Sequence, residues 1–261
     1  MLSFLNLQPR RKYFLPTSTV FHIDATAAAS YPGSGQTWAN IINAPSDGLI
    51  KSAYDFWIGR DNTANSEDLT FSSNKFTSDG GDLAEIKSTT DFIRNQFRSD
   101  LTNSWWSAAA FLIASASASQ TFYGSTNASS VPGWRIEANT TPLMRLVRSD
   151  GTQNLATSLH NITSFIGLPV LHVFTWNNGT RGYKSALNSR TFTVSGTAAE
   201  TTQTAANTGK LNFGSANHGT QKMLSGSELY GFAMGTGPLT NADLSKIVDF
   251  FNSLHRRPYV A

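Results

Sequence analysis

Glu and Asp are the residues in this sequence that could hydrolyse a glycosidic bond. The reaction needs two of them on one face of a strand. Alternation places residues i and i+2 on a common face, ~5 Å apart, as a retaining mechanism requires. The sequence contains neither Glu-x-Asp-x-Glu nor Glu-x-Asp-x-x-Glu. Glu137, Glu200 and Glu228 each stand alone, so we predict no catalytic residues and no enzymatic activity.

The segment Asp79-Gly80-Gly81-Asp82 offers oxygen ligands for a cation. Together with Asp24 or Asp61, these two aspartates would supply the carboxylates that calcium prefers. A turn whose Asp side chains accept hydrogen bonds from their own backbone explains the same pattern. We therefore expect no cofactor and keep calcium, bound by Asp79 and Asp82, as the alternative.

The histidines and the lack of cysteine argue against other metal sites. The five histidines show no His-x-His or His-x-x-x-His spacing, so zinc is not expected. The chain has no cysteine, which excludes disulfides and thiolate ligands. His172 lies in the most apolar segment, and we predict that it is a hydrogen-bonded core histidine.

Residues 133–194 have the pattern of short antiparallel strands. They are rich in β-branched and aromatic residues, and Asp150-Gly151 and Asn178-Gly179 mark tight turns between them. Apolar and polar residues alternate over 133–139, which predicts a sheet with one face in solvent. Residues 170–176 are apolar on both faces and predict a central strand that is covered on both sides. The segment indicates an antiparallel sandwich.

One helix is predicted, over residues 240–255. Thr240 is a suitable N-cap, and Asp243 stands where its side chain can bond back to the cap. Arg256-Arg257-Pro258 ends the helix. The residues that form one apolar stripe are Leu244, Ile247, Val248, Phe251 and Leu254. We expect this stripe to pack on a sheet.

The positive charge of the chain is concentrated at its beginning. The 261 residues carry a net charge of +3, and Arg10, Arg11 and Lys12 lie in a segment without acidic residues. Of the 20 Lys and Arg residues, these three leave 17 to balance the 17 Asp and Glu residues. A nucleic-acid-binding body would need clustered cations, so we exclude that class. Charged residues make up only 14% of the chain, which suits a surface that makes contacts through hydroxyls and amides.

Several motifs occur in an order that resembles concanavalin A-like (laminin-G-like) jelly rolls, in particular those of bacteriophage virion proteins. The similarity covers about residues 19 to 257. The motifs are Phe21-His22-Ile23-Asp24, Ser30 to Trp38, Phe76 to Asp82, Gly133-Trp134-Arg135-Ile136, His172 to Asn177, and Gly182 to Asn188. Ser189 stands where the family usually has glycine. The resemblance implies an all-β, two-sheet antiparallel jelly-roll sandwich, a fold that hosts lectins, hydrolases and inert shells.

The six tryptophans divide into two groups in this comparison. Trp105, Trp134 and Trp176 match core positions of the family. Trp38 and Trp57 lie near predicted loops and are the candidates for stacking on sugar rings. A structural role is the alternative for both.

Residues 1–18 form an arm that resembles no strand of the sandwich. We predict that Arg10, Arg11 and Lys12 help to anchor it on another virion protein, with a disordered tail as the alternative. Residues 1–7 are apolar but short, and their cations follow them, the reverse of a secretion signal. No segment approaches the ~20 apolar residues that span a bilayer. We expect a virion location, synthesis in the host cytoplasm and no contact with membrane.

These observations predict an arm over 1–18 and one jelly roll over 19–261 that includes the helix. The predicted function is a bacteriophage virion structural protein: a capsid decoration, head-fibre or tail-associated subunit, multimeric in the particle. Weak binding of host surface polysaccharide is a further expectation. A carbohydrate-active enzyme and a standalone lectin are the alternatives.

Overall fold

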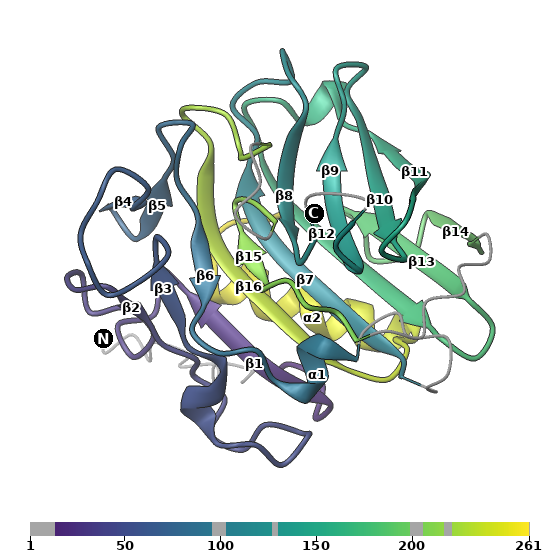
Figure 1. Ribbon diagram of the computed structural model, residues 1–261, viewed down its shortest axis with the longest axis horizontal. Coiled ribbons are helices and arrows are strands. Elements are labelled where there is room, and N and C mark those ends of the chain that lie inside the picture. The colour runs from purple at the N-terminus through teal and green to yellow at the C-terminus, as the bar shows by residue number, and fades with distance from the viewer. Residues whose placement is uncertain (1–13, 96–102, 127–129, 199–205, 217–220, 261) are drawn as a thin grey trace, which may run out of the picture.

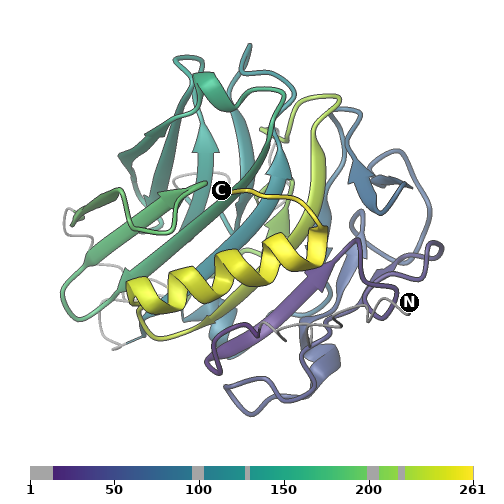
Figure 2. The same ribbon diagram turned by 180° about the vertical axis from the view of Figure 1, so that it is seen from behind.

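Two antiparallel β-sheets lie face to face, and one helix covers the outer side of one of them (Figures 1 and 2). The computed structural model describes residues 14–95, 103–126, 130–198, 206–216 and 221–260. Eight strands form each sheet within this part of the chain. The arrangement confirms the predicted all-β sandwich with a C-terminal helix.

The first sheet, called sheet A, has β12 and β7 near its centre. Its order is β14 (Val194–Thr197), β13 (Gly182–Leu187), β12 (Pro169–Asn177), β7 (Trp105–Leu112), β16 (Glu228–Thr236), β5 (Lys75–Thr77) and β4 (Thr70–Ser72). β1 (Thr19–Asp24) also pairs with β16, farther along that strand than β5 does.

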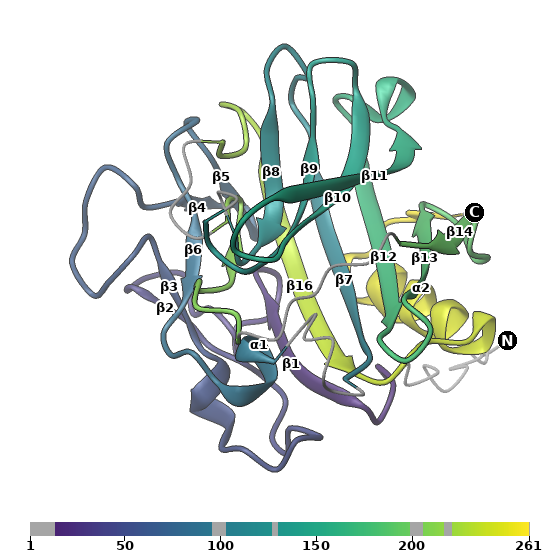
Figure 3. The same ribbon diagram turned by 45° about the vertical axis from the view of Figure 1, so that its right-hand side comes forward.

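The second sheet, called sheet B, faces the viewer in Figure 1 and is seen more from the side in Figure 3. Its order is β11 (Asn154–Asn161), β10 (Leu143–Ser149), β9 (Gly133–Ala138), β8 (Gln120–Gly124), β15 (Asn212–Phe213), β6 (Ala84–Ile86), β3 (Phe56–Ile58) and β2 (Thr37–Trp38). Short helical segments are η1 (Lys51–Tyr54), α1 (Asp91–Arg94) and η2 (Thr163–Phe165).

Aromatic side chains fill the space between the sheets. Trp105, Trp134 and Trp176 are buried, as predicted from the family comparison. The rings of Trp105 and Trp134 stack across the interface with centroids 4.4 Å apart. Because these side chains project from facing sheets, their burial holds the two layers together.

Helix α2 (Asn241–His255) covers the outer face of sheet A, as expected. Thr240 and Asp243 form the predicted capping box. Four residues of the predicted stripe pack in a second core with Leu171 and Val173 of β12, whereas Leu254 is only half-buried and lies outside that core. The strand predicted to be covered on both sides is therefore buried between sheet B and α2.

A chain of hydrogen bonds crosses the interior between the sheets. Tyr123 Oη of β8 lies 2.8 Å from His172 Nδ1 of β12, and His172 Nε2 lies 2.8 Å from Ser185 Oγ of β13. His160 Nε2 of β11 lies 2.7 Å from the same Ser185 oxygen. Ser107 Oγ of β7 completes the chain at 3.1 Å from the Tyr123 oxygen. His172 is thus a hydrogen-bonded core histidine, as predicted.

The polar face of β9 differs from the expectation of a solvated surface. Arg135 and Glu137 do lie on the face opposite Trp134, but they are buried. The Arg135 Nε donates to a Glu137 oxygen at 2.6 Å, and Arg145 of β10 donates to the other oxygen. Alternation correctly predicted the face on which these side chains lie. It did not predict that they would be buried and ion-paired there.

Candidate functional site

The three predicted arm cations, Arg10, Arg11 and Lys12, lie outside the described residues. The last part of the arm contacts the sandwich. Ser18 O accepts a hydrogen bond from Thr236 N at 2.9 Å, and Ser18 Oγ accepts one from Trp106 Nε1 at 3.1 Å. The anchoring role of the cations stays a prediction.

The prediction that Trp38 is an exposed sugar platform is wrong. Trp38 lies in β2 and is 0% exposed. Its ring packs between Phe76, with centroids 4.5 Å apart, and Phe213, at 6.1 Å. Thr37 and Trp38 alternate in direction, and the pairing with β3 turns Trp38 toward the core. A sugar cannot reach it.

Trp57, the other predicted platform, lies on the outer face of sheet B and is half-buried. The Lys87 ammonium sits 3.8 Å from the centroid of its ring and also donates to Thr37 Oγ1 at 2.7 Å. This cation–π contact covers one face of the indole. Its role in glycan binding stays a prediction.

The Asp79–Asp82 segment is a turn that uses its own carboxylates. Asp82 Oδ2 accepts from Asp79 N at 2.8 Å, and Asp79 Oδ1 accepts from Gly81 N at 2.8 Å. Burial, chiefly, raises the pKa of Asp82 to about 6. Asp61 accepts from Thr63 N in a turn of its own, at 2.7 Å. The segment therefore matches the alternative to a calcium site, a turn whose Asp side chains accept hydrogen bonds from their own backbone.

Asp24, the other candidate calcium ligand, is bonded to histidines. Its Oδ2 lies 2.8 Å from His255 Nε2 of α2 and 3.3 Å from His22 Nε2. These hydrogen bonds outweigh burial and hold the pKa of Asp24 well below its usual range. Within the part of the chain that the structure describes, no three His, Asp or Glu side chains gather as a metal site. Calcium at Asp79 and Asp82 stays the alternative to the prediction of no cofactor.

Both described glutamates that the sequence singled out bond to cationic side chains, and Glu228 also accepts a hydrogen bond from a tyrosine hydroxyl. Glu137 is held by Arg135 and Arg145, and Glu228 by Lys75 and Tyr230. Glu200 lies outside the described residues. A retaining hydrolase would need a second acidic residue within ~5 Å of Glu137. The described strand β9 contains none.

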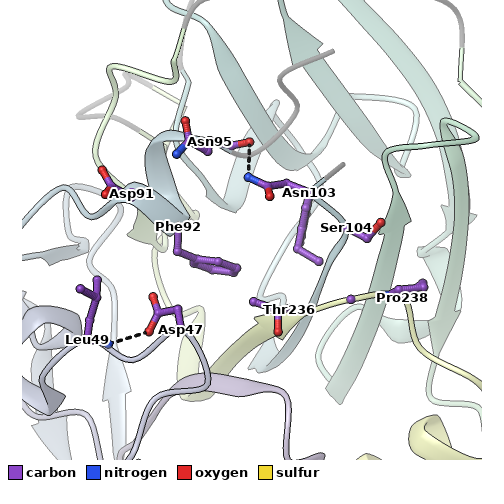
Figure 4. A pocket seen from close by; sticks show the side chains of 11 residues that line it. Asp47, Leu49, Asp91, Phe92, Asn95, Asn103, Ser104, Thr236 and Pro238 are labelled. Atoms are coloured by element: carbon purple, nitrogen blue, oxygen red, sulfur yellow. Dashed lines mark hydrogen bonds between the residues drawn. The ribbon is translucent and has the colours of Figure 1, made fainter. Parts of the chain in front are cut away.

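A concave site lies at one end of the sandwich, where β16 ends and β7 begins (Figure 4). We call it the end pocket, and its volume is about 510 Å³. Side chains from α1, from the loop before η1 and from the β16–α2 connection converge on it. The lining residues are Asp47, Leu49, Asp91, Phe92, Asn95, Asn103, Ser104, Trp105, Thr236, Gly237 and Pro238.

Hydrogen bonds fix the polar wall of the end pocket. Asp47 accepts from the Leu49 N–H at 3.2 Å and from the Tyr54 hydroxyl. Burial and the bond to Asp47 raise the pKa of Tyr54, so that this hydroxyl stays a donor. Asn103 Nδ2 donates to Asn95 O at 3.2 Å, which leaves the Asn103 carbonyl directed elsewhere. The pocket therefore combines ordered carboxylate and amide groups.

Phe92 supplies the aromatic wall of the pocket. Thr90 caps α1 by accepting from Ile93 N, so the helix begins at Asp91 and places Phe92 beside the cavity. Ile93 turns into the core. Phe92 stays half-buried and meets the Tyr54 ring edge to face, with the ring centroids 6.4 Å apart. An aromatic ring, carboxylates, amides and hydroxyls together suit a small polar ligand with an apolar face.

The sequence did not predict this pocket. Its lining comes from four segments that span almost 200 positions, and none of them carries a motif. The one local signal was Asp91-Phe92 at a helix start, which is too common to indicate a site. Only strand pairing, which sets Thr236 opposite Trp105, brings these segments together.

No protein-family model matches the chain, and no curated protein matches it. The binding domain of botulinum neurotoxin serotype D superimposes with a TM-score of 0.59 at 12% identity, covering 88% of this chain and 50% of that one. A structure of botulinum neurotoxin type C, whose cell entry is described as dependent on interaction with two ganglioside molecules, gives a TM-score of 0.59 at 11% identity, covering 91% of this chain and 51% of that one. The NanB sialidase of Streptococcus pneumoniae gives only 0.45 at 14% identity, covering 54% and 23%.

The toxin matches show a shared β-sandwich fold and nothing more at this identity. This chain spans about half the length of the toxin chains that it matches. The sandwich predicted from the motif order is thereby confirmed. Its association with bacteriophage proteins stays a prediction. Neither described helix has the length and apolar character to cross a membrane.

Proposed function

We propose that this protein is a non-catalytic carbohydrate-binding subunit of a bacteriophage virion, and that its end pocket receives a sugar ring. The observation that carries the binding proposal is the lining of that pocket. Sugar rings present apolar C–H faces bordered by hydroxyls that both donate and accept hydrogen bonds. Phe92 matches the apolar face, and Asp91, Asn103 and Thr236 match the hydroxyls.

The fold is compatible with this proposal. The toxin domains that share it are described as receptor-binding, and one structure is described through its gangliosides. This is an argument by fold analogy, and it assigns no residue. The virion role rests on the order of motifs in the sequence and on the surface poor in charge.

The non-catalytic part of the proposal rests on the state of Asp47. Its two oxygens accept bonds from Leu49 N and the Tyr54 hydroxyl, so it acts as a fixed acceptor. Asp91 is the other carboxylate of the pocket. Release of reducing sugar by the wild-type protein that disappears in Asp91→Asn would make the protein an enzyme and overturn this part.

The binding proposal is tested with a panel of immobilised bacterial polysaccharides and two matched variants. Phe92→Leu keeps apolar bulk beside Tyr54 but removes the flat ring, and should weaken binding ~2- to 10-fold, since an aromatic contact contributes ~0.5–1.5 kcal/mol. Trp57→Phe changes an aromatic residue outside the pocket and should leave binding unchanged. Equal binding by wild type and Phe92→Leu would contradict the assignment of the end pocket. Loss of binding only in Trp57→Phe would move the site to sheet B.

A further inference from the structure

A second hollow of similar size lies beside the end pocket, on the other side of Pro238. We call it the side pocket, and its volume is about 540 Å³. Pro238 is exposed and lines both hollows. The lining residues of the side pocket are Thr175, Asn177, Thr180, Gly182, Tyr183, Lys184, Ser195, Gly196, Pro238, Leu239 and Thr240.

The two pockets lie along one row of cross-strand partners. Thr236 pairs with Trp105, Trp105 with Trp176, and Trp176 with Tyr183. The row begins at the end pocket and ends at the side pocket. Strands are spaced by ~4.8 Å, so the row measures ~14 Å from β16 to β13. A ligand that fills both pockets must therefore be an oligomer of several rings that crosses Pro238.

The charges of the two pockets are opposite. Two carboxylates, Asp47 and Asp91, line the end pocket, and no cation does so among its described lining residues. Among the described residues that line the side pocket, Lys184 alone is charged. Its side chain is exposed, and no described carboxylate lies within ion-pair distance of its ammonium. The Lys184 ammonium lies 5.9 Å from the centroid of the Phe192 ring, a cation–π contact that leaves its N–H donors available.

The positive end of α2 does not account for this polarity. Thr240 accepts from Asp243 N, and Asp243 in turn accepts from Thr240 N, so the cap brings a negative charge to the helix start. Lys184 thus supplies the cationic character of the side pocket. Asn177, Thr180 and Ser195 add amide and hydroxyl groups around it.

From this juxtaposition we infer that the ligand is an acidic oligosaccharide, with an uncharged ring in the end pocket and a carboxylate-bearing ring beside Lys184. The inference rests on the proposed function and names its ligand class. A bond between a charged donor and a charged acceptor is about twice as strong as a neutral one, which gives the acidic form its advantage. Carboxylate rings are repelled from Asp47 and Asp91, so the chain binds in one direction.

The test compares oligosaccharides of hyaluronan and unsulfated chondroitin, in which uncharged and carboxylate-bearing rings alternate, with their carboxyl-reduced forms, by calorimetry with the full chain. Wild type should bind at least one acidic form about 10-fold more tightly than its reduced counterpart. Lys184→Gln should remove that advantage and leave the affinity for the reduced form unchanged. Lys246→Gln is the matched control, because it removes the same charge from α2, where Lys246 pairs with Asp243 outside both pockets. It should keep the advantage.

The outcomes separate this inference from the proposed function. Equal affinity for acidic and reduced forms, or an equal loss in both lysine variants, would overturn the role of Lys184 and leave sugar binding in the end pocket standing. Binding of the reduced forms that is lost in Phe92→Leu would support the end pocket by itself. Failure of every acidic and reduced form to bind would overturn the inference together with the proposed function.

Discussion

Acid should destabilise this fold through the two histidines that join the sheets. His172 is 0% exposed, and burial lowers its pKa well below the ordinary value of 6.5. Burial also lowers the pKa of His160 to about 4. Both rings share the Ser185 hydroxyl, whose single proton can be donated to only one of them. The folded state therefore favours neutral rings, with one Nε2 donating and the other accepting.

The sign and size of the effect follow from proton linkage. Between pH 6.5 and about 4 the unfolded chain binds protons that the folded chain excludes, so the free energy of unfolding falls as the pH falls. At pH 5 this costs ~2 kcal/mol for His160 relative to pH 7.5, and His172 adds a loss of the same sign. Asp82 acts in the opposite direction, because its raised pKa of about 6 lets the folded chain gain a proton, worth ~1 kcal/mol at pH 5.

Urea unfolding of wild type and His160→Gln at pH 7.5 and pH 5 measures this contribution. The glutamine amide can still bond to Ser185 but does not titrate, so the variant should lose ~2 kcal/mol less than wild type between the two pH values. Taking the difference between the proteins removes the contributions of Asp82 and of the other titrating groups. A loss in His160→Gln equal to that of wild type, within ~0.5 kcal/mol, would refute the reasoning.

Other substitutions test the remaining features. Trp38→Ala should lower the free energy of unfolding by ~3–5 kcal/mol in urea, and by more than Trp57→Ala, because only Trp38 leaves a cavity in the core. A larger loss in Trp57→Ala would contradict the orientation of β2. Glu137→Gln should cost ~3 kcal/mol by the same measurement, since Arg135 would keep a buried charge without its carboxylate; a neutral effect would show that the pair is solvated. Deletion of residues 2–12 should leave the melting temperature unchanged but prevent incorporation into particles, and normal incorporation would exclude the anchoring role. Addition of 1 mM calcium should leave the melting temperature unchanged, because the Asp82 carboxylate already bonds its own turn; a rise would revive the calcium site.

The sequence by itself determined the features that depend on neighbouring residues. Thr240 and Asp243 stand three residues apart and cap α2 wherever the helix lies. Alternation in 133–139 predicted which way Trp134 and Arg135 point, because side chains of a strand alternate regardless of its partners. The apolar segment 170–176 predicted a strand covered on both sides, and with it the burial of His172.

Tertiary structure alone decided the features that depend on pairing between distant segments. The pairing of β2 with β3 turned Trp38 inward, and no residue near Trp38 signals that register. Burial of Arg135 and Glu137 required Arg145 from another strand. The end pocket and the side pocket each combine segments that only the sheet order brings together. Local patterns set the direction of a side chain, whereas its exposure depends on what the rest of the chain places over it.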